Sequence, residues 1–355
     1  MDSLLTQDVA PGTFKSYISQ WRQWITFCFY FHLRHLFDSE YEVTYVLQQQ
    51  LCSYAVFLAS GSLSFPVIQT YCTTAVVKWH QYNGIVISTA KPSMLRLHTV
   101  LAALKRQIPA KINHRLPLTP DLLVKMSLQA DNNLNLTNIC HLAMQSLLIY
   151  ACRRLGEVCR TTIAEFDPSK HVTLQCVALD ESSGTMVVIF PTTKTRQNGP
   201  PLICAIKRQS HHTSFCAFKW MRLWLTHSGI TDPNAPLFQR ITQSTQLCTG
   251  QPLLKQSFIK TLQQKIRLVD PEAPFKCFTG HSFRIAAATI LALLCGMPDS
   301  TVMEVGDWSS ECFRKYITMS HHQKLLSSSS LGGVFSQLQN VFSQPAPLEI
   351  QPKGS

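Results

Sequence analysis

Apolar residues recur at helical spacing through most of the N-terminal third of the chain. In the segment PGTFKSYISQWRQWITFCFYF, the hydroxyl residue Thr13 stands where a helix N-cap is expected. One face of this predicted helix is formed by Phe14, Ile18, Trp21, Ile25 and Cys28. The same spacing returns over residues 43–60, 66–82 and 93–107. The pattern therefore predicts a domain of four helices over residues 1–108.

Helical spacing stops at the stretch IPAKINHRLPLTP, which contains three prolines and no apolar periodicity. This composition is typical of a linker, and we predict one over residues 109–119, with a new helix starting after Thr119. A loop within a single domain has a similar composition, so that interpretation stays open.

Beyond the linker, helical and strand-like patterns follow one another. An apolar helix is predicted over residues 136–160, and further helices over 213–228, about 251–268, 281–296 and 298–318. Three apolar runs between them, HVTLQCVAL, TMVVIFPTTKT and PLICAI, are separated by the turn sequences DESSG and RQNGP. They predict a small three-stranded antiparallel sheet. The chain is thus expected to be mainly helical (α+β), with a second domain over 120–326 that contains this sheet.

The last segment, residues 327–355, begins with a serine run and reads as a flexible tail. Within it, one face of a short amphipathic helix is formed by Val334, Phe335, Leu338, Val341 and Phe342. This face needs a partner surface, which is either the helix's own domain or a neighbouring subunit.

The charge balance indicates a polyanionic partner. Lys and Arg number 32 against 20 Asp and Glu, a formal net charge of +12. The basic residues are scattered among structured-looking segments, which favours a folded groove over a basic tail. The longest apolar stretch, IAAATILALLCGM, is too short to span a bilayer, and no N-terminal signal segment is visible. A membrane partner is therefore not expected.

The 13 cysteines bear on metals and on the compartment. They contain no C-x-x-C pair, and the two His doublets lack a cysteine at zinc-finger spacing. Many lie in apolar segments, where a thiol acts as a small hydrophobic group. We therefore expect reduced, buried cysteines in an intracellular protein, with neither a disulfide framework nor a zinc site.

Several basic side chains have local contexts that suit a shared site. The motif RRLGE places Arg154 and Glu157 one helical turn apart, so the carboxylate can hold the guanidinium. The motif HSFR places His281 and Arg284 on one helix face, and TTKT places Lys194 at the end of a predicted strand before a turn. Each fragment alone is more often structural or solvated than catalytic. Their order along the chain, followed by Trp and then Tyr, is the distinctive feature.

This ordered set resembles the catalytic domain of tyrosine recombinases, the phage-integrase family. The segment HSFRIAAATILALLCGMPDSTVMEVGDWSSECFRKYI is similar in particular to recombinases of DIRS-like retrotransposons and related eukaryotic mobile elements. The resemblance covers roughly residues 115–320, and the preceding four-helix domain is similar in size and position to the family's SAM-like core-binding domain. It implies an active site made of Arg154, Lys194, His281, Arg284, Trp308 and Tyr316.

Two positions leave alternatives open. Arg153 competes for the first arginine position, and Arg154 is preferred because it matches the family's Arg-x-x-Glu spacing with Glu157. The family commonly has His or Trp nine residues before the tyrosine, whereas Asp307 stands there in this chain. An acidic group beside a phosphate would weaken anion binding unless it points away.

The resemblance gives each residue a chemical role. Tyr316 would attack a DNA phosphodiester, although a phenol is mostly protonated at neutral pH. Arg154 and Arg284 would hold the nonbridging oxygens and neutralise the growing charge. His281 would accept or orient a proton, and Lys194 would protonate the departing 5′-oxygen. Trp308 would donate its indole N–H or support the site by packing, with plain core packing as an equal alternative.

The expected protein is a site-specific DNA recombinase or integrase that acts on double-stranded DNA through a covalent 3′-phosphotyrosine, without cofactor or metal. Self-association on DNA through the tail is expected, and nuclear residence follows only from the eukaryotic-element resemblance. Two alternatives remain: a type IB topoisomerase-like enzyme that relaxes DNA, and a non-catalytic DNA-binding protein in which Asp307 has impaired the site.

Overall fold

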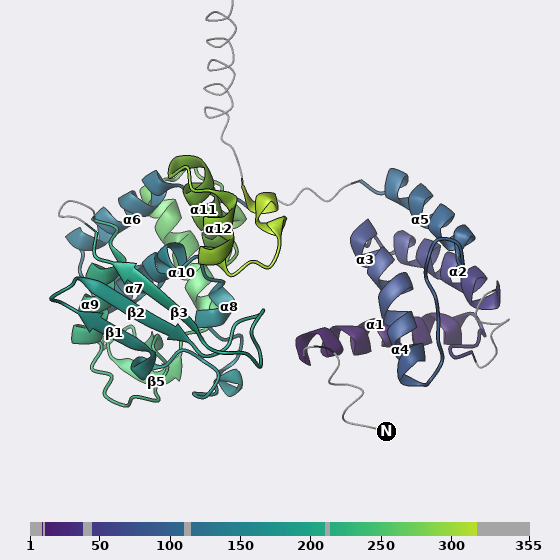
Figure 1. Cartoon of the computed structure of the whole chain (residues 1–355), viewed down its shortest axis with the longest axis horizontal. Helices are drawn as coiled ribbons and strands as arrows, with labels where there is room; N and C mark the ends of the chain where they lie inside the picture. The colour runs from purple at the N-terminus through teal and green to yellow at the C-terminus, as the bar shows by residue number, and fades with distance from the viewer. Residues whose placement is uncertain (1–8, 10, 38–44, 110–114, 210–213, 318–355) are drawn as a thin grey trace, which may run out of the picture. The chain divides into compact units, whose positions relative to one another are not determined.

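The computed structural model describes residues 9, 11–37, 45–109, 115–209 and 214–317. The chain divides into two units, residues 1–113 and 114–355 (Figure 1), and each has its own hydrophobic core. The division falls within the stretch predicted as a linker. The predicted amphipathic tail, residues 327–355, lies outside the described residues.

Unit 1 is helical, and four helical stretches occur where the apolar spacing predicted them. Its elements are α1 (Pro11–Tyr30), α2 (Leu47–Ser60), α3 (Phe65–Thr70), α4 (Val76–Tyr82) and α5 (Leu95–Gln107). A π-helical turn, Tyr71–Ala75, joins α3 to α4 into one continuous stretch. The first helix begins at Pro11, so the predicted N-cap Thr13 lies inside it and that prediction is wrong. Proline fits the first helical turn because its missing N–H has no intrahelical partner there.

The buried face of α1 is rotated from the predicted one. Trp24 and Phe27 are fully buried, and the Trp24 ring lies 5.1 Å from the Tyr54 ring of α2. Of the predicted face, Trp21 and Cys28 are buried, whereas Phe14, Ile18 and Ile25 are partly or largely exposed. The larger aromatic rings remove more apolar area from water, so they decide which face packs inward.

Unit 2 combines helices with two small sheets. Its helices are α6 (Pro120–Asn132), α7 (Leu136–Tyr150), α8 (Leu155–Val158), α9 (Ala217–His227), α10 (Lys255–Val269), α11 (Ser282–Thr289) and α12 (Asp299–Gly306). Its strands are β1 (Val177–Asp180), β2 (Thr185–Phe190), β3 (Leu202–Lys207), β4 (Gln239–Ile241) and β5 (Cys248–Pro252). The helix predicted after Thr119 is α6, and the Thr119 hydroxyl caps it by accepting from the Leu122 N–H at 3.2 Å.

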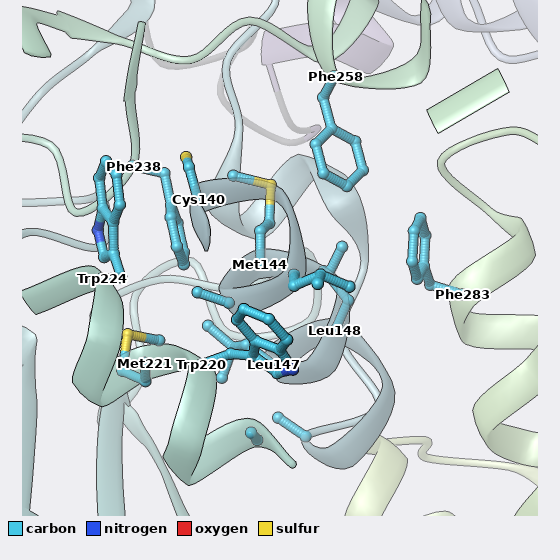
Figure 2. Close-up of a cluster of buried hydrophobic side chains, with 14 of the residues drawn as sticks. Cys140, Met144, Leu147, Leu148, Trp220, Met221, Trp224, Phe238, Phe258 and Phe283 are labelled. Carbon is cyan, nitrogen blue, oxygen red and sulfur yellow. The ribbon is translucent and has the colours of Figure 1, made fainter. Parts of the chain in front are cut away.

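The core of unit 2 surrounds α7, which is buried along nearly its whole length. Figure 2 shows side chains of α7 between those of α9 and the rings of Phe258 and Phe283 from α10 and α11. Because α7 is buried on all faces, it forms a central helix with other elements packed around it. This central position fixes where the end of α7 lies relative to α11.

The predicted three-stranded antiparallel sheet is confirmed, with strand order β1-β2-β3. Alternate residues of β2, Met186, Val188 and Phe190, are fully buried and join the core around α7. The hairpin of β4 and β5 was not predicted. Its strands are short, and β5 contains Gly250 and Pro252, which weaken a strand signal.

The predicted helix over residues 136–160 is wrong in its second half. The helix ends at Tyr150, and Cys152 adopts a left-handed conformation with φ of 51°. The Arg153 N–H donates to the Leu148 carbonyl and the Cys152 N–H to the Ile149 carbonyl, a Schellman ending with cysteine in the place that glycine usually takes. The chain therefore turns before the two arginines and starts the short helix α8.

The predicted helices over 281–296 and 298–318 are also shorter than expected. The first is α11, continued by a π-helical turn over Ile290–Leu294. The second ends at Gly306, and the left-handed residue Asp307 separates it from a 3₁₀ helix over Glu311–Tyr316. A helical period persists through such breaks, so spacing alone does not locate them.

All thirteen cysteines are unpaired, and seven of them are buried. Cys295 and Cys312 are exposed, in contrast to the expectation of burial.

Among the described residues, no helix combines the length and apolarity needed to cross a bilayer.

Candidate functional site

Five of the six candidate residues, all except Lys194, lie on three chain segments of unit 2 that meet. These are the turn between α7 and α8, the first turn of α11, and the segment from the end of α12 to Tyr316. A small hydrophobic cluster joins the three, and it includes Cys152, Ala287, Trp308 and Phe313, with Tyr316 packed against it. Packing, rather than the chain sequence, therefore brings residues more than 150 positions apart into one site.

The turn after α7 directs the two arginines of the RRLGE motif into different environments, one partly exposed and one buried. Arg154 is partly exposed, and its Nη1 donates to Glu157 Oε1 at 3.0 Å. Glu157 also accepts the backbone N–H of Arg154 at 3.1 Å, so one buried carboxylate fixes both the backbone and the guanidinium. Arg153 is fully buried and donates to the Ala151 and Val305 carbonyls, both at 2.6 Å.

Arg284 of α11 is fully buried and ties the same two helix ends together. Its Nη1 donates to the Cys152 carbonyl at 2.8 Å, and its Nη2 donates to the Gly306 carbonyl at 2.7 Å. The guanidinium carbon lies 4.0 Å from the centre of the Trp308 ring, within cation–π range. Burial lowers the pKa of Arg284 to about 10, which leaves it charged at neutral pH.

The rings of His281 and Tyr316 are in contact within the site. His281 immediately precedes α11, and its ring centre lies 4.9 Å from that of Tyr316 in an edge-to-face arrangement. Tyr316 ends the 3₁₀ helix, and its carbonyl accepts from the Thr289 hydroxyl at 3.1 Å. The rings of Tyr316 and Trp308 lie 6.0 Å apart, so Arg284, Trp308, Tyr316 and His281 form one continuous set of contacts.

Burial and several cations around His281 lower its pKa. Burial has the largest effect, and the charges of Arg115, Arg284, Arg154 and Lys194 lower the pKa further. Four cations from four separate parts of unit 2 therefore act on one imidazole. This environment favours the neutral imidazole, which is the form that can accept a proton.

The motif TTKT predicted Lys194 at the end of a strand, and this prediction is wrong. Strand β2 ends at Phe190, and Lys194 is exposed in the loop that leads to β3. The turn around it is closed by two backbone hydrogen bonds, from the Thr193 N–H to the Arg196 carbonyl at 3.2 Å and from the Arg196 N–H to the Thr193 carbonyl at 3.3 Å.

Asp307 turns toward this loop. Its side chain is 11% exposed and forms an ion pair with Arg196 at 2.9 Å. Burial raises the pKa of the Asp307 carboxyl, but hydrogen bonds from Thr195 and Arg196 and the charges of Arg196 and Arg153 outweigh that effect. The pKa consequently lies below its usual range, and the group is an anion with its own counter-ion.

Trp308 is 7% exposed and fills the space beside α12. A Cβ atom added at Gly306 would lie 1.8 Å from Cζ3 of Trp308, so only glycine leaves room for this ring. The contacts with Phe313, Tyr316 and Arg284 place the indole beneath the site as a packing element.

Sequence reasoning missed Arg115. This residue is exposed, it precedes Leu116, whose N–H donates to the Cys277 carbonyl, and its charge acts on His281. It lies in the stretch predicted as a linker, and nothing in its local spacing distinguishes it from other exposed basic residues.

A cavity of about 490 Å³ elsewhere in unit 2 is lined mainly by polar residues of α7, α10 and the β4–β5 hairpin. None of the six candidate residues lines it. Within the described part of the chain, no group of three or more His, Cys, Asp or Glu is arranged to hold a metal ion.

Comparisons with known proteins bear on the fold. No protein-family model matches the sequence, and no curated protein sequence matches it. Among solved structures, the XerH site-specific recombinase bound to a palindromic difH substrate is similar with a TM-score of 0.52 and 12% identity, over 81% of this chain and 72% of that one. The Tn1549 transposon integrase bound to transposon right-end DNA is similar with a TM-score of 0.50 and 13% identity, over 80% and 85%. The chain therefore has the fold of tyrosine recombinases.

Proposed function

We propose that this protein is a site-specific DNA recombinase that cuts and rejoins duplex DNA through Tyr316. The observation that carries the proposal is the 4.9 Å separation of the Tyr316 and His281 rings, because His281 also lies in the field of Arg154, Arg284 and Lys194. A phenol beside a neutral imidazole and several cations suits attack on a phosphodiester. The likeness of the fold to recombinases solved on DNA agrees with this function.

The reaction is a transesterification in which bonds and protons balance. The Tyr316 oxygen forms a bond to phosphorus while the bond to the 5′-oxygen breaks, and the 3′-phosphate stays on the enzyme. The phenol proton passes to His281, and Lys194 gives a proton to the departing 5′-oxygen. Attack by another strand's 5′-hydroxyl reverses each transfer, so the exchange needs no external energy source.

Arg154 and Arg284 take different parts in this scheme. Arg154 is the partly exposed guanidinium, and Glu157 holds its fork in place for the nonbridging oxygens. Arg284 contributes its charge from the buried side, where each terminal nitrogen keeps one N–H beyond the bonds to Cys152 and Gly306. Arg153 joins α7 to α12 through two carbonyls, which supports assigning the first arginine position to Arg154.

Other parts of the proposal concern partners and location. Double-stranded DNA is the proposed partner, and the scheme names no metal or cofactor. Self-association through residues 327–355, an origin in DIRS-like elements and residence in the nucleus remain parts of the proposal that rest on sequence alone.

The covalent step is tested with a nicked suicide duplex, which loses a short product and traps the enzyme on DNA. A pool of random duplexes serves while the target site is unknown. We expect the wild type to form a denaturant-resistant adduct and Tyr316→Phe to form none, with similar DNA affinity for both, because the substitution removes one hydroxyl oxygen. Adduct formation is measured by gel electrophoresis.

Tyr30→Phe is the matched control, because Tyr30 is an exposed tyrosine of unit 1, outside the candidate site. It should form the adduct as the wild type does. Equal trapping by Tyr316→Phe would refute the assignment of the nucleophile. Normal DNA binding without any adduct from the wild type would favour a non-catalytic DNA-binding protein.

A further inference from the structure

The strands β2 and β3 do not by themselves fix the position of the loop that carries Lys194. It connects Phe190, the last residue of β2, to Leu202, the first residue of β3. A connection of this length is normally mobile, since its backbone does not take part in the strand ladder. A general acid needs a stable position within hydrogen-bond reach of the leaving oxygen. Another part of the protein must therefore hold the loop.

Asp307 makes hydrogen bonds to three of the four residues in the turn around Lys194. Its Oδ2 accepts from the Thr195 hydroxyl at 2.6 Å and from the Thr193 hydroxyl at 3.4 Å. Its Oδ1 accepts from Nε of Arg196 at 2.9 Å, and Nη2 of Arg196 forms an ion pair with the same oxygen at 2.9 Å. Both carboxylate oxygens are thus engaged by the residues that flank Lys194.

The backbone at Asp307 fixes the direction of this carboxylate. Asp307 follows the last residue of α12 in the left-handed conformation, with φ of 53° and ψ of 51°. That conformation costs a non-glycine residue about 1 kcal/mol, and glycine or asparagine usually occupies it. The next residue is Trp308, which packs against Tyr316. One helix ending therefore aims a carboxylate at the loop and an indole at the tyrosine.

The charge of Asp307 does not oppose phosphate binding in this arrangement. Its pKa is lowered by Thr195, Arg196 and Arg153, so it stays ionised, and Arg196 pairs with it. The negative charge of Asp307 is offset by the positive charge of Arg196, and the carboxylate faces Thr195 and Arg196. The acidic residue at this position thus acts on the loop.

We propose that Asp307 is a positioning residue, which holds the turn of residues 193–196 so that Lys194 can protonate the leaving 5′-oxygen. This inference rests on the proposed function of Tyr316 and Lys194. It also explains how a chain with Asp at this position can retain the activity, because the carboxylate serves Lys194 instead of contacting the phosphate.

The test compares cleavage of two suicide duplexes, one with the ordinary 5′-oxygen and one with sulfur at that position. A thiolate leaves with little need of a proton, since thiols are far more acidic than alcohols. We expect Asp307→Asn to slow cleavage of the oxygen duplex by about 10- to 100-fold, part of the effect of a general acid. It should leave cleavage of the sulfur duplex nearly unchanged, as Lys194→Ala should.

A double-variant cycle gives the second readout. If Asp307 acts through Lys194, the combined variant Asp307→Asn, Lys194→Ala should cleave the oxygen duplex no more slowly than Lys194→Ala alone. A defect that adds to that of Lys194→Ala, or that is equal on the oxygen and sulfur duplexes, overturns the proposal. Asp131→Asn is the control, because it breaks a comparable ion pair with Lys219 at 2.7 Å and should change neither rate.

Trypsin digestion tests the contact without depending on catalysis, because trypsin cuts after Lys194 and Arg196. Asp307→Asn should increase cutting in this turn, and so should Thr195→Val, which leaves the Arg196 pair intact and keeps the test valid if Asp307→Asn unfolds. Unchanged cutting in both variants overturns the proposed clamp. A wild type that forms no adduct refutes the proposed function instead, while digestion still decides whether Asp307 holds the turn.

Discussion

Arg153 and Arg284 show how single residues hold this site together. Both are fully buried, and within the described ranges neither pairs with a carboxylate; each spans the carbonyls at the ends of α7 and α12 instead. The carbonyl end of a helix carries partial negative charge, so it can stabilise a cation without neutralising it. Two cations without a directly bonded carboxylate therefore lie between the ends of α7 and α12.

The close fit of Gly306 against Trp308 gives a prediction at the scale of one residue. Gly306→Ala places a methyl group where Trp308 now lies, and overpacking of this kind should destabilise unit 2 by about 3 kcal/mol. Urea unfolding followed by tryptophan fluorescence measures the loss. Gly12→Ala is the control, because nothing lies within 4 Å of its added Cβ, and it should change stability by less than about 1 kcal/mol. Equal stability of both variants would contradict the packing described for Trp308.

At the scale of elements, two helix endings of the same kind build the site. The helices α7 and α12 both stop with a Schellman arrangement whose left-handed residue is not glycine: Cys152 in one and Asp307 in the other. The residues that follow, Arg153 and Trp308, turn inward from these endings. Both endings are the places where the predicted helices were too long.

The packing of α7 against α10 predicts a dependence of stability on pH. The His141 ring of α7 stacks on Phe258 of α10 at 4.9 Å, and burial, with a smaller effect of Lys265, holds the pKa of His141 well below its usual value. The unfolded chain therefore binds a proton near pH 6.5 that the folded protein does not, so stability falls as the pH decreases below that value.

We expect His141 to account for a loss of about 2 kcal/mol between pH 7 and pH 5. His141→Phe should keep the stacking and abolish that part of the loss, as measured by urea unfolding at both pH values. Lys265, with its pKa lowered to about 8 by burial, stays protonated throughout this range and adds little to the difference. His227→Gln, at an exposed position of α9, should retain the full loss; an unchanged loss in His141→Phe would refute the linkage.

At the scale of the whole molecule, the net charge of +12 determines how DNA should be bound. Each phosphate that a protein neutralises releases counterions, so affinity for duplex DNA depends steeply on salt. The four cations that act on His281 show that part of this charge is concentrated at the site.

We expect the full chain to lose affinity for duplex DNA by about 10³- to 10⁵-fold between about 50 and 200 mM salt, as for a protein with six to ten phosphate contacts. Fluorescence anisotropy with a labelled duplex measures it across a salt series. Tyr316→Phe should give the same slope, since it changes no charge. An affinity nearly independent of salt would contradict binding through the phosphate backbone.

The order of chemical groups along the chain was readable from sequence, and so were most elements. Helical spacing located the helices of unit 1, and three apolar runs predicted the β1-β2-β3 sheet, because apolar patterning follows directly from which face is buried. The β4–β5 hairpin and the ends of α7 and α12 were missed. The ends of these two helices depend on left-handed turns at Cys152 and Asp307, residue types that do not usually mark such turns.

The sequence by itself determined the kinds of side chain available for chemistry, the positive charge and the mainly helical fold, because these follow from composition and local periodicity. Only the tertiary structure decided which way each arginine of the Arg153–Arg154 pair points, that His281 and Tyr316 are neighbours, and that Asp307 faces the loop of Lys194. Those relations depend on contacts between segments that are distant along the chain, which no local pattern encodes.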